Sequence, residues 1–230
     1  MKIILNGTSS SGKSTIMKLL PKNYKKVSFD GYYNKIICDH EIKPHNRFYK
    51  NKYYTQKEKL KIIFNTRWQY YKMEVKNSNN FIIDTVEINP EFNASKLKKY
   101  LSIKNSKCVL LYTNLSNLIR NIEKRRNYEP RGLNVFHQFT ILYTITDKEN
   151  DAIGVVCLKD FIKDLKQVKY LFSSEKELIT FAKDIFKKLN IKYQKMDKKY
   201  YIKPVDKYDI VLNTTNKTPK QLVKELNKYV

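Results

Sequence analysis

The sequence predicts an α/β fold with a five-stranded parallel sheet, helices on both faces of the sheet and a helical insertion. Short apolar runs alternate with helical patterns along the 230 residues, and a loop bounded by glycines joins the first run to a helix. The interval before the last run is too long for a single crossover. Strands that alternate with helices pair in parallel, because each helix carries the chain back to the starting edge of the sheet.

Five runs of apolar residues are expected to form the strands. They comprise residues 2–5, 26–29, 81–84, 109–112 and 209–213. A helical pattern follows the first strand, and further helices are expected over residues 56–75 and 91–102. The final helix is expected to begin with Thr218 as a hydroxyl cap, Pro219 at the first helical position and Gln221 three residues after the cap.

The interval between the fourth and fifth strands carries more helices than one crossover needs. Helices are expected over residues 115–126 and 135–141, and two amphipathic helices over residues 156–171 and 174–189. Neither a repeat nor a linker separates this segment from the rest. We therefore treat residues 1–230 as a single domain with a helical insertion at about residues 145–205.

The net charge of +24 favours polyanionic partners in general, because clustered cations gain affinity by releasing counterions. Only six of the 46 basic residues are Arg, and the chain is also rich in Asn, Ile and Tyr. Codon bias in an A/T-rich coding sequence produces the same composition. Compositional bias is therefore favoured over a dedicated nucleic-acid surface, which stays an alternative.

The three cysteines, Cys38, Cys108 and Cys157, form no CxxC pair, which argues against both a disulfide framework and a structural zinc site. The apolar start of the chain is too short for a signal peptide, and no run approaches the roughly 18 apolar residues of a membrane span. We expect a cytoplasmic protein in a reducing compartment, without a membrane partner.

The strongest motif is Gly7-x-x-x-x-Gly12-Lys13-Ser14, a phosphate-binding loop between the first strand and the following helix. Glycines let the backbone wrap round a polyphosphate, and successive amides at the helix start point at the anion. Lys13 is expected to reach the terminal phosphates of a nucleoside triphosphate, and the Ser14 hydroxyl to bind Mg²⁺. The residues expected to bind the nucleotide are Gly7, Thr8, Ser9, Ser10, Ser11, Gly12, Lys13, Ser14 and Thr15.

Two aspartates close predicted strands near this loop. Asp84 ends an apolar strand, where P-loop proteins often place a carboxylate for the magnesium ion, and the alternative is a cap or turn residue. Asp30 follows the second strand and is favoured as the base that accepts the proton of an attacking hydroxyl. A simple Asp-Gly turn is the alternative for Asp30, since Gly31 follows it.

Three of the six arginines, Arg125, Arg126 and Arg131, fall within seven residues. Arginine suits planar recognition of phosphate, and its use departs from the lysine-rich background. The cluster is expected to close over the nucleotide as a lid and to neutralise charge on the transferred group. The alternative is a cationic helix end that complements the helix dipole.

These features resemble the chloramphenicol phosphotransferase-like P-loop kinases. The residues that carry the resemblance are 3–14, Asp30, 123–126, 130–132, Gln138 and 208–219. The resemblance implies an adenylate-kinase-like sheet and a phosphorylation of a small-molecule hydroxyl that depends on ATP and Mg²⁺. It places the phosphate loop at Gly7 to Ser14, the catalytic aspartate at Asp30 and the lid arginines at Arg125 and Arg131. It does not extend to the insertion or to residues 31–56, so no acceptor is carried over.

The favoured function is a kinase that transfers the γ-phosphoryl group of ATP to a hydroxyl group, with Asp30, Lys13, Arg125 and Arg131 as catalytic residues and Ser14 and Asp84 at the metal. One alternative is a polynucleotide 5′-hydroxyl kinase or a related end-processing enzyme, which would use the positive charge. Another is a regulatory NTP-binding protein in which the amphipathic helices of the insertion recruit a partner. Those helices are expected instead to pack on their own domain.

Overall fold

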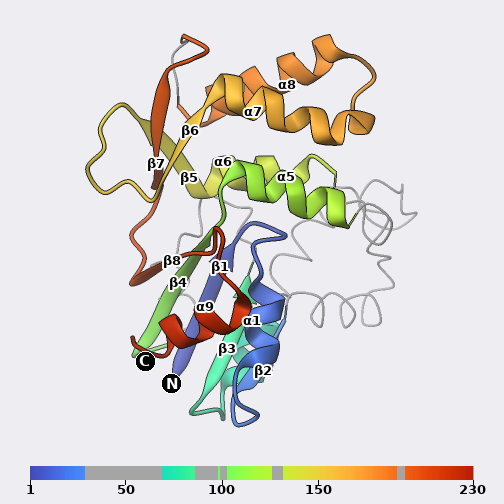
Figure 1. The fold of residues 1–230 in the computed structure, drawn as a ribbon. Helices are drawn as coiled ribbons and strands as arrows, with labels where there is room; N and C mark the ends of the chain where they lie inside the picture. The colour runs from blue at the N-terminus through green and yellow to red at the C-terminus, as the bar shows by residue number, and fades with distance from the viewer. Residues whose placement is uncertain (29–68, 86–97, 99–102, 126–131, 191–194, 230) are drawn as a thin grey trace.

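The computed structural model describes residues 1–28, 69–85, 98, 103–125, 132–190 and 195–229. Its lower part in Figure 1 is a parallel sheet with the strand order β2-β3-β1-β4-β8. The predicted fold class is confirmed. The strands are β1 (Lys2–Gly7), β2 (Lys25–Val27), β3 (Phe81–Thr85), β4 (Ser106–Tyr112) and β8 (Ile210–Asn213).

The central strand β1 carries the glycine-bounded loop at its carboxyl end. Asn6 is in register with Thr85 of β3, and Gly7 is in register with Leu111 of β4. Ligands of open parallel sheets bind beyond the carboxyl ends of the strands. The register therefore sets the loop between the ends of β3 and β4, where a ligand is expected.

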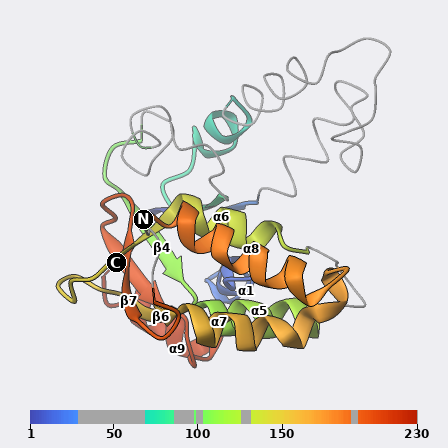
Figure 2. The same cartoon turned by 90° about the horizontal axis from the view of Figure 1, so that it is seen from above.

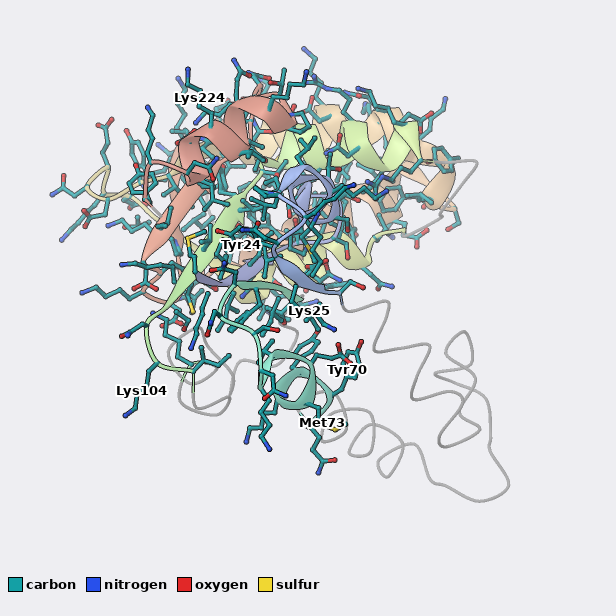
Figure 3. The ribbon with its side chains drawn as sticks, turned by 90° about the horizontal axis from the view of Figure 1, so that it is seen from below. Tyr24, Lys25, Tyr70, Met73, Lys104 and Lys224 are labelled. Carbon is teal, nitrogen blue, oxygen red and sulfur yellow. The ribbon has the colours of Figure 1, made fainter. Side chains whose placement is uncertain are left out.

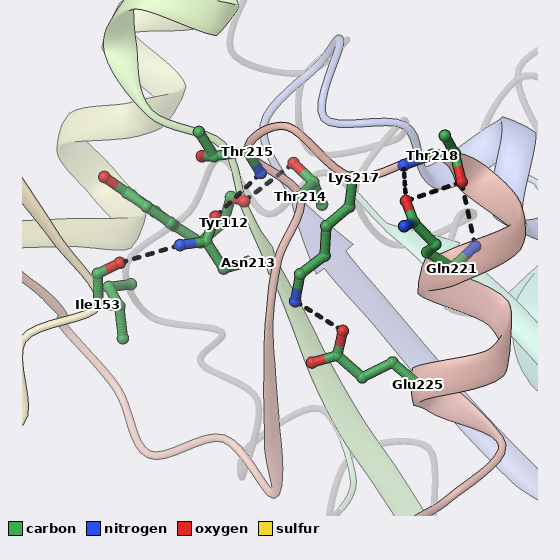
Figure 4. Close-up of polar contacts among 9 residues, drawn as sticks. All are labelled: Tyr112, Ile153, Asn213, Thr214, Thr215, Lys217, Thr218, Gln221 and Glu225. Carbon is green, nitrogen blue, oxygen red and sulfur yellow. Dashed lines mark hydrogen bonds and ion pairs between the residues drawn. The ribbon is translucent and has the colours of Figure 1, made fainter.

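Helices α1 (Lys13–Leu19) and α9 (Pro219–Leu226) cover one face of this sheet (Figure 1). The predicted cap of α9 is confirmed: the Thr218 hydroxyl accepts the Gln221 N–H at 3.3 Å, and the Gln221 side-chain oxygen accepts the Thr218 N–H at 2.8 Å (Figure 4). The apolar sides of the two helices meet the sheet in a shared core. This core includes Leu5, Ile16, Met17, Ile82, Leu212, Leu222 and Leu226.

The other face is covered by helical residues 69–75, the only described part of the helix expected over 56–75. Tyr71 and Val75 are buried there, in a core with strand residues of β1 and β3. Lys25 of β2 forms an ion pair with Glu74 at 2.8 Å, whereas Met73 points away from the protein and is 67% exposed (Figure 3). Helices thus cover both faces of the sheet.

A second layer of helices lies above the carboxyl edge of the sheet. Figures 1 and 2 show α5 (Leu115–Lys124) and α6 (Asn134–Leu142) next to the sheet, with α7 (Leu158–Leu165) and α8 (Glu175–Lys188) beyond them. A 3₁₀ segment, η2 (Lys166–Leu171), follows α7 directly and leads to α8. The helices expected over residues 115–126, 135–141 and 174–189 are confirmed, whereas the one expected over residues 156–171 begins at Leu158 and continues as η2 after Leu165. Of the helix expected over residues 91–102, only residue 98 lies within the described residues. None of the helices within the described ranges is long and apolar enough to cross a bilayer.

The insertion also contains a three-stranded antiparallel sheet that the sequence analysis did not predict. Its order is β5-β7-β6, from β5 (Tyr143–Thr146), β6 (Gly154–Cys157) and β7 (Lys199–Pro204). Strand β5 follows α6 directly, and β6 runs directly into α7. Strands β5 and β6 are four residues long, and no turn separates either of them from the adjacent helix, so their side-chain pattern cannot be told from that of the helix. Their partner β7 lies far along the chain.

The apolar stripes of α7 and α8 are buried inside the protein, as expected. At the start of α8 the Ser174 hydroxyl caps the Glu177 N–H, while the Glu177 carboxylate accepts from Ser173. A surface that recruits a partner would leave the stripes exposed, so they do not support the regulatory alternative. The buried members are Leu158, Phe161, Ile162, Leu165, Leu178, Ala182, Ile185 and Leu189.

The insertion packs directly on strand β4. The Tyr143 hydroxyl donates to the Leu111 carbonyl at 3.1 Å, and the rings of Tyr112 and Tyr143 meet edge to face at 5.4 Å. A Cβ at Gly154 would lie 2.0 Å from the Tyr112 hydroxyl, so only glycine fits at that point of β6. Residues of β4, α5, α6 and the insertion therefore share one hydrophobic core.

Candidate active site

The loop between β1 and α1 has a backbone that needs its glycines. A Cβ on Gly7 would lie 2.8 Å from the Ser11 hydroxyl and 2.9 Å from the Leu111 carbonyl oxygen. Gly12, the N-cap residue of α1, has φ +96°, which side chains rarely adopt. No side chain caps α1, and the first amides of a helix have few acceptors within the helix; in α1 the Thr15 N–H reaches the Gly12 carbonyl at 3.1 Å. The loop is therefore shaped to receive an anion.

Lys13 is buried and lies against the loop itself. Its ammonium donates to the carbonyl oxygens of Gly7 and Thr8, each at 2.8 Å, and stands 4.0 Å from the Asp84 carboxylate. Only 5% of its side chain is exposed. The Lys13 ammonium therefore lies against the glycine loop at the carboxyl edge of the sheet, where the sequence analysis expects a cation for the phosphates.

Asp84 belongs to strand β3, one residue before its end, and its side chain is 9% exposed. It is in register with Leu5 of β1, and the Tyr71 hydroxyl donates to its backbone carbonyl at 3.1 Å. The carboxylate faces Lys13. Asp84 therefore lies beside Lys13 at the carboxyl edge of the sheet, and its expected role as a magnesium ligand stays a prediction.

Four hydroxyl oxygens at this edge are buried without a hydrogen-bond partner in the described part of the chain. They belong to Thr8, Ser10 and Ser11 of the loop and to Thr85 at the end of β3. Burying a hydroxyl without a partner costs about 1–3 kcal/mol. Such a group of hydroxyls indicates a site that a polar ligand completes. Ser14 and Thr15, in contrast, are exposed on the first turn of α1.

Two side chains that the sequence analysis did not assign to the site hold the loop from the helical layer. Gln138 of α6 accepts the Ser9 N–H at 2.6 Å, and Asn121 of α5 donates to the Ser10 carbonyl at 3.0 Å. Gln138 is the last residue of the stretch from residue 123 that resembles the family, and this position in the resemblance was the signal that could have identified it. Asn121 precedes Arg125 by one helical turn, and no pattern in the sequence marked it.

A third polar contact fixes the start of the loop. Asn6 accepts the Gly7 N–H at 2.8 Å, and its side-chain nitrogen donates to the Tyr208 hydroxyl at 3.0 Å. Asn6 is 2% exposed. The sequence analysis assigned no role to either side chain.

The predicted lid residues are described only in part. Arg125 forms the C-cap of α5, four positions and about one helical turn after Asn121, which contacts the loop. The lid interpretation and the alternative of a cation at the C-terminus of α5 both stay predictions for Arg125. Asp30, Arg126 and Arg131 lie outside the described residues, and so does the segment 31–56.

Among solved structures, the chain is similar to several kinases. Shikimate kinase from Aquifex aeolicus vf5 is 15% identical with a TM-score of 0.44, covering 100% of this chain and 95% of that one. Shikimate kinase from Acinetobacter baumannii, in complex with shikimate, is 11% identical with a TM-score of 0.46, covering 99% and 91%. Dephospho-CoA kinase from Campylobacter jejuni is 15% identical with a TM-score of 0.36, covering 99% and 96%.

A search of curated proteins gave no match. The model of one protein family, described as chloramphenicol phosphotransferase-like protein, matches residues 1–130, which is more than half of the chain. The matched part contains β1, the glycine loop, Lys13, Asp84, Asn121 and Arg125. This chain is therefore a member of the chloramphenicol phosphotransferase-like family of P-loop phosphotransferases.

Proposed function

We propose that this protein is a kinase that uses ATP and Mg²⁺ to phosphorylate a hydroxyl group of a small-molecule acceptor. The observation that carries the proposal is the group formed by the buried Lys13–Asp84 pair and the buried loop hydroxyls, at the carboxyl edge of the sheet. This arrangement offers a cation, hydroxyl groups and backbone amides to a polyphosphate within a single loop.

In this proposal the loop backbone and the Lys13 ammonium bind the phosphates of ATP. Lys13 is held by two carbonyl oxygens that carry only partial charge, so a phosphate oxygen can compete for its protons. As negative charge spreads over the transferred group, the ammonium stabilises the transition state more than the ground state.

The residues present fit a magnesium ion. Ser14 supplies a hydroxyl oxygen and Asp84 a carboxylate oxygen, the hard ligands that Mg²⁺ prefers. Within the described residues, no cluster of three or more His, Cys, Asp or Glu side chains could hold a metal alone. A magnesium ion at Ser14 and Asp84 would take its other ligands from phosphate and water, and would neutralise charge on the phosphates.

Asp30 is the proposed base. It accepts the proton of the acceptor hydroxyl while that oxygen forms a bond to the γ-phosphorus, and the bond to the bridging oxygen breaks to release ADP. Arg125 and Arg131 are proposed to neutralise the phosphoryl oxygens as the lid closes. Family membership supports phosphoryl transfer, and the kind of acceptor is part of the proposal.

The test is transfer of labelled γ-phosphate from ATP to a panel of nucleosides, sugars, small alcohols and 5′-hydroxyl oligonucleotides. We expect labelled product with at least one small molecule and a loss of about 10²-fold or more in Asp30→Asn. Asp39→Asn, the same change in the same segment, is the control. Equal transfer by Asp30→Asn would overturn the base assignment, and labelling of oligonucleotides alone would overturn the small-molecule acceptor.

A further inference from the structure

The glycine loop is held by two helices that the chain reaches far later in the sequence. Gln138 of α6 accepts a hydrogen bond from the Ser9 N–H at 2.6 Å, although 129 positions separate them, and the Asn121 side chain of α5 donates a hydrogen bond to the Ser10 carbonyl at 3.0 Å. One side chain is an acceptor and the other a donor. Together they fix both ends of the two-residue segment Ser9–Ser10.

That segment contains a strained residue. Ser10 has φ +68°, in the left-handed region that residues other than glycine rarely adopt. Unfavourable conformations of this kind persist when the surrounding contacts over-determine them. The hydrogen bonds of Gln138 and Asn121 flank Ser10 on both sides and supply that constraint.

On the side away from the loop, α5 and α6 pack against helices α7 and α8 of the insertion. The Ser116 hydroxyl of α5 bonds to Asp164 of α7, and Phe136 of α6 packs edge to face on Phe161 of α7 and Phe181 of α8, at 5.4 and 5.8 Å. Figure 2 shows α5 beside α7 and α6 beside α8, with α1 seen between the two pairs. The loop is therefore connected to the insertion through α5 and α6.

We infer that Gln138 and Asn121 are positioning residues that hold the phosphate loop in its binding conformation, and that the insertion supports them. This inference rests on the proposed function, because it concerns the same nucleotide site. Its consequence is specific: loss of either side chain weakens contacts to the phosphate chain of the nucleotide and leaves contacts to the nucleoside unchanged.

The experiment compares ATP with AMP as ligands, by calorimetry, in Gln138→Met and Asn121→Leu. Both substitutions keep the approximate length of the side chain and remove its hydrogen bond. A hydrogen bond of about 1.4 kcal/mol corresponds to tenfold in affinity, so ATP is expected to bind about tenfold more weakly and AMP less than twofold. Gln167→Met, the same change at an exposed position of η2, is the control and should bind both ligands like the wild type.

The double variant supplies a second readout. Because both hydrogen bonds fix the same segment, the two losses in ATP affinity should not add. An equal loss for ATP and AMP, unchanged ATP affinity in both folded variants, or strictly additive losses would overturn the inference. Failure of the wild type to bind ATP would instead overturn the proposed function, so the two failures are distinguishable.

Discussion

The ammonium of Lys13 and the carboxylate of Asp84 stand 4.0 Å apart at the carboxyl edge of the sheet, and each side chain is less than a tenth exposed. The pair joins the phosphate loop to strand β3. It also places opposite charges where a phosphate and a metal ion would bind. Two predictions follow from this contact.

Lys13→Ala is expected to lose about 10²–10³-fold in turnover, because one charge that stabilises the transferred group is removed. It should also lose about 3 kcal/mol of stability, since the Asp84 carboxylate stays buried without the lysine. Adding Asp84→Asn to Lys13→Ala should restore most of the stability and none of the turnover. Denaturant unfolding and steady-state rates check both parts. A double variant no more stable than the single one would contradict the role of the pair.

Asp84→Asn alone is expected to raise the Mg²⁺ concentration needed for half-maximal activity by about tenfold, because an amide oxygen replaces a carboxylate near the metal. Magnesium titrations of the initial rate measure this shift. Asp209→Asn, at the opposite end of the sheet, is the control and should titrate like the wild type. An unchanged magnesium requirement in Asp84→Asn would remove Asp84 from the metal site.

The two loop glycines are expected to differ in their tolerance of alanine. Gly7→Ala places a Cβ 2.9 Å from the Leu111 carbonyl, a backbone atom that cannot move freely, and should cost about 3 kcal/mol. Gly12→Ala meets no atom within 4 Å and should cost about 1 kcal/mol, the strain of its positive φ. Unfolding in denaturant compares the two, and equal losses would show that crowding at Gly7 is not decisive.

Tyr112 and Gly154 form the tight contact between β4 and the insertion. Gly154→Ala should destabilise by about 3 kcal/mol, and Tyr112→Phe should recover only part of this, because the ring carbon Cζ would still lie 2.6 Å from the new Cβ. The Tyr112 hydroxyl has no hydrogen-bond partner in the described residues, so Tyr112→Phe alone should be neutral or stabilising.

Tyr143→Phe is the matched comparison for Tyr112→Phe. Its hydroxyl donates to the Leu111 carbonyl, so its loss should cost about 1 kcal/mol or more. Thermal unfolding of the variants ranks their stabilities. If Tyr112→Phe is the more destabilised of the two variants, the Tyr112 hydroxyl does form a hydrogen bond in the folded protein.

Asp209 predicts a pH dependence of stability. Burial raises the pKa of its carboxyl. Hydrogen bonds from Lys98 at 2.5 Å and from the Cys108 N–H at 2.6 Å, together with the positive charges of Lys98 and Lys107, outweigh this effect and hold the pKa below its ordinary value. A carboxylate with a lowered folded pKa adds stability above its unfolded pKa of about 3.9, and loses it as the pH falls through the folded value.

Asp209→Asn should therefore be less stable than the wild type by about 1 kcal/mol at pH 7, a figure reduced because the carboxylate is about one-third exposed. The difference should shrink as the pH falls below the unfolded pKa of about 3.9 and approach zero once the pH is below the lowered folded pKa. Urea unfolding at pH 7 and at successively lower pH values tests this prediction. Asp197→Asn, which breaks an exposed ion pair with Lys159 at 3.2 Å, is the control and should show no measurable change. A difference that persists at low pH would show that charge is not its cause.

The sequence predicted the elements whose signals are local. Strands β1, β3, β4 and β8 each contain a short apolar run, and the residues Thr218, Pro219 and Gln221 predict the cap of α9. The glycine loop is contiguous, so its position between β1 and α1 could be predicted as well. Local signals of this kind reflect backbone preference and side-chain period, which neighbouring residues largely decide.

The antiparallel sheet of the insertion could not be predicted from local sequence patterns. Its helices were predicted because their apolar stripes repeat over several turns, whereas β5 and β6 are four residues long and continuous with helices. A short strand is stabilised by its partner, and β7 is reached only after α8. The antiparallel sheet therefore depends on pairing across the chain, which periodicity does not report.

By itself, the sequence determined that a phosphate loop joins a buried strand to a helix, and that the chain resembles a family of phosphotransferases. Only the tertiary structure decided which side chains surround that loop. Asp84 meets Lys13 because β3 pairs with β1, and Gln138 meets Ser9 because the helical layer packs over the sheet. Contacts of this kind depend on strand order and on the packing of distant helices, so they follow from the energy of the whole core and not from any local pattern.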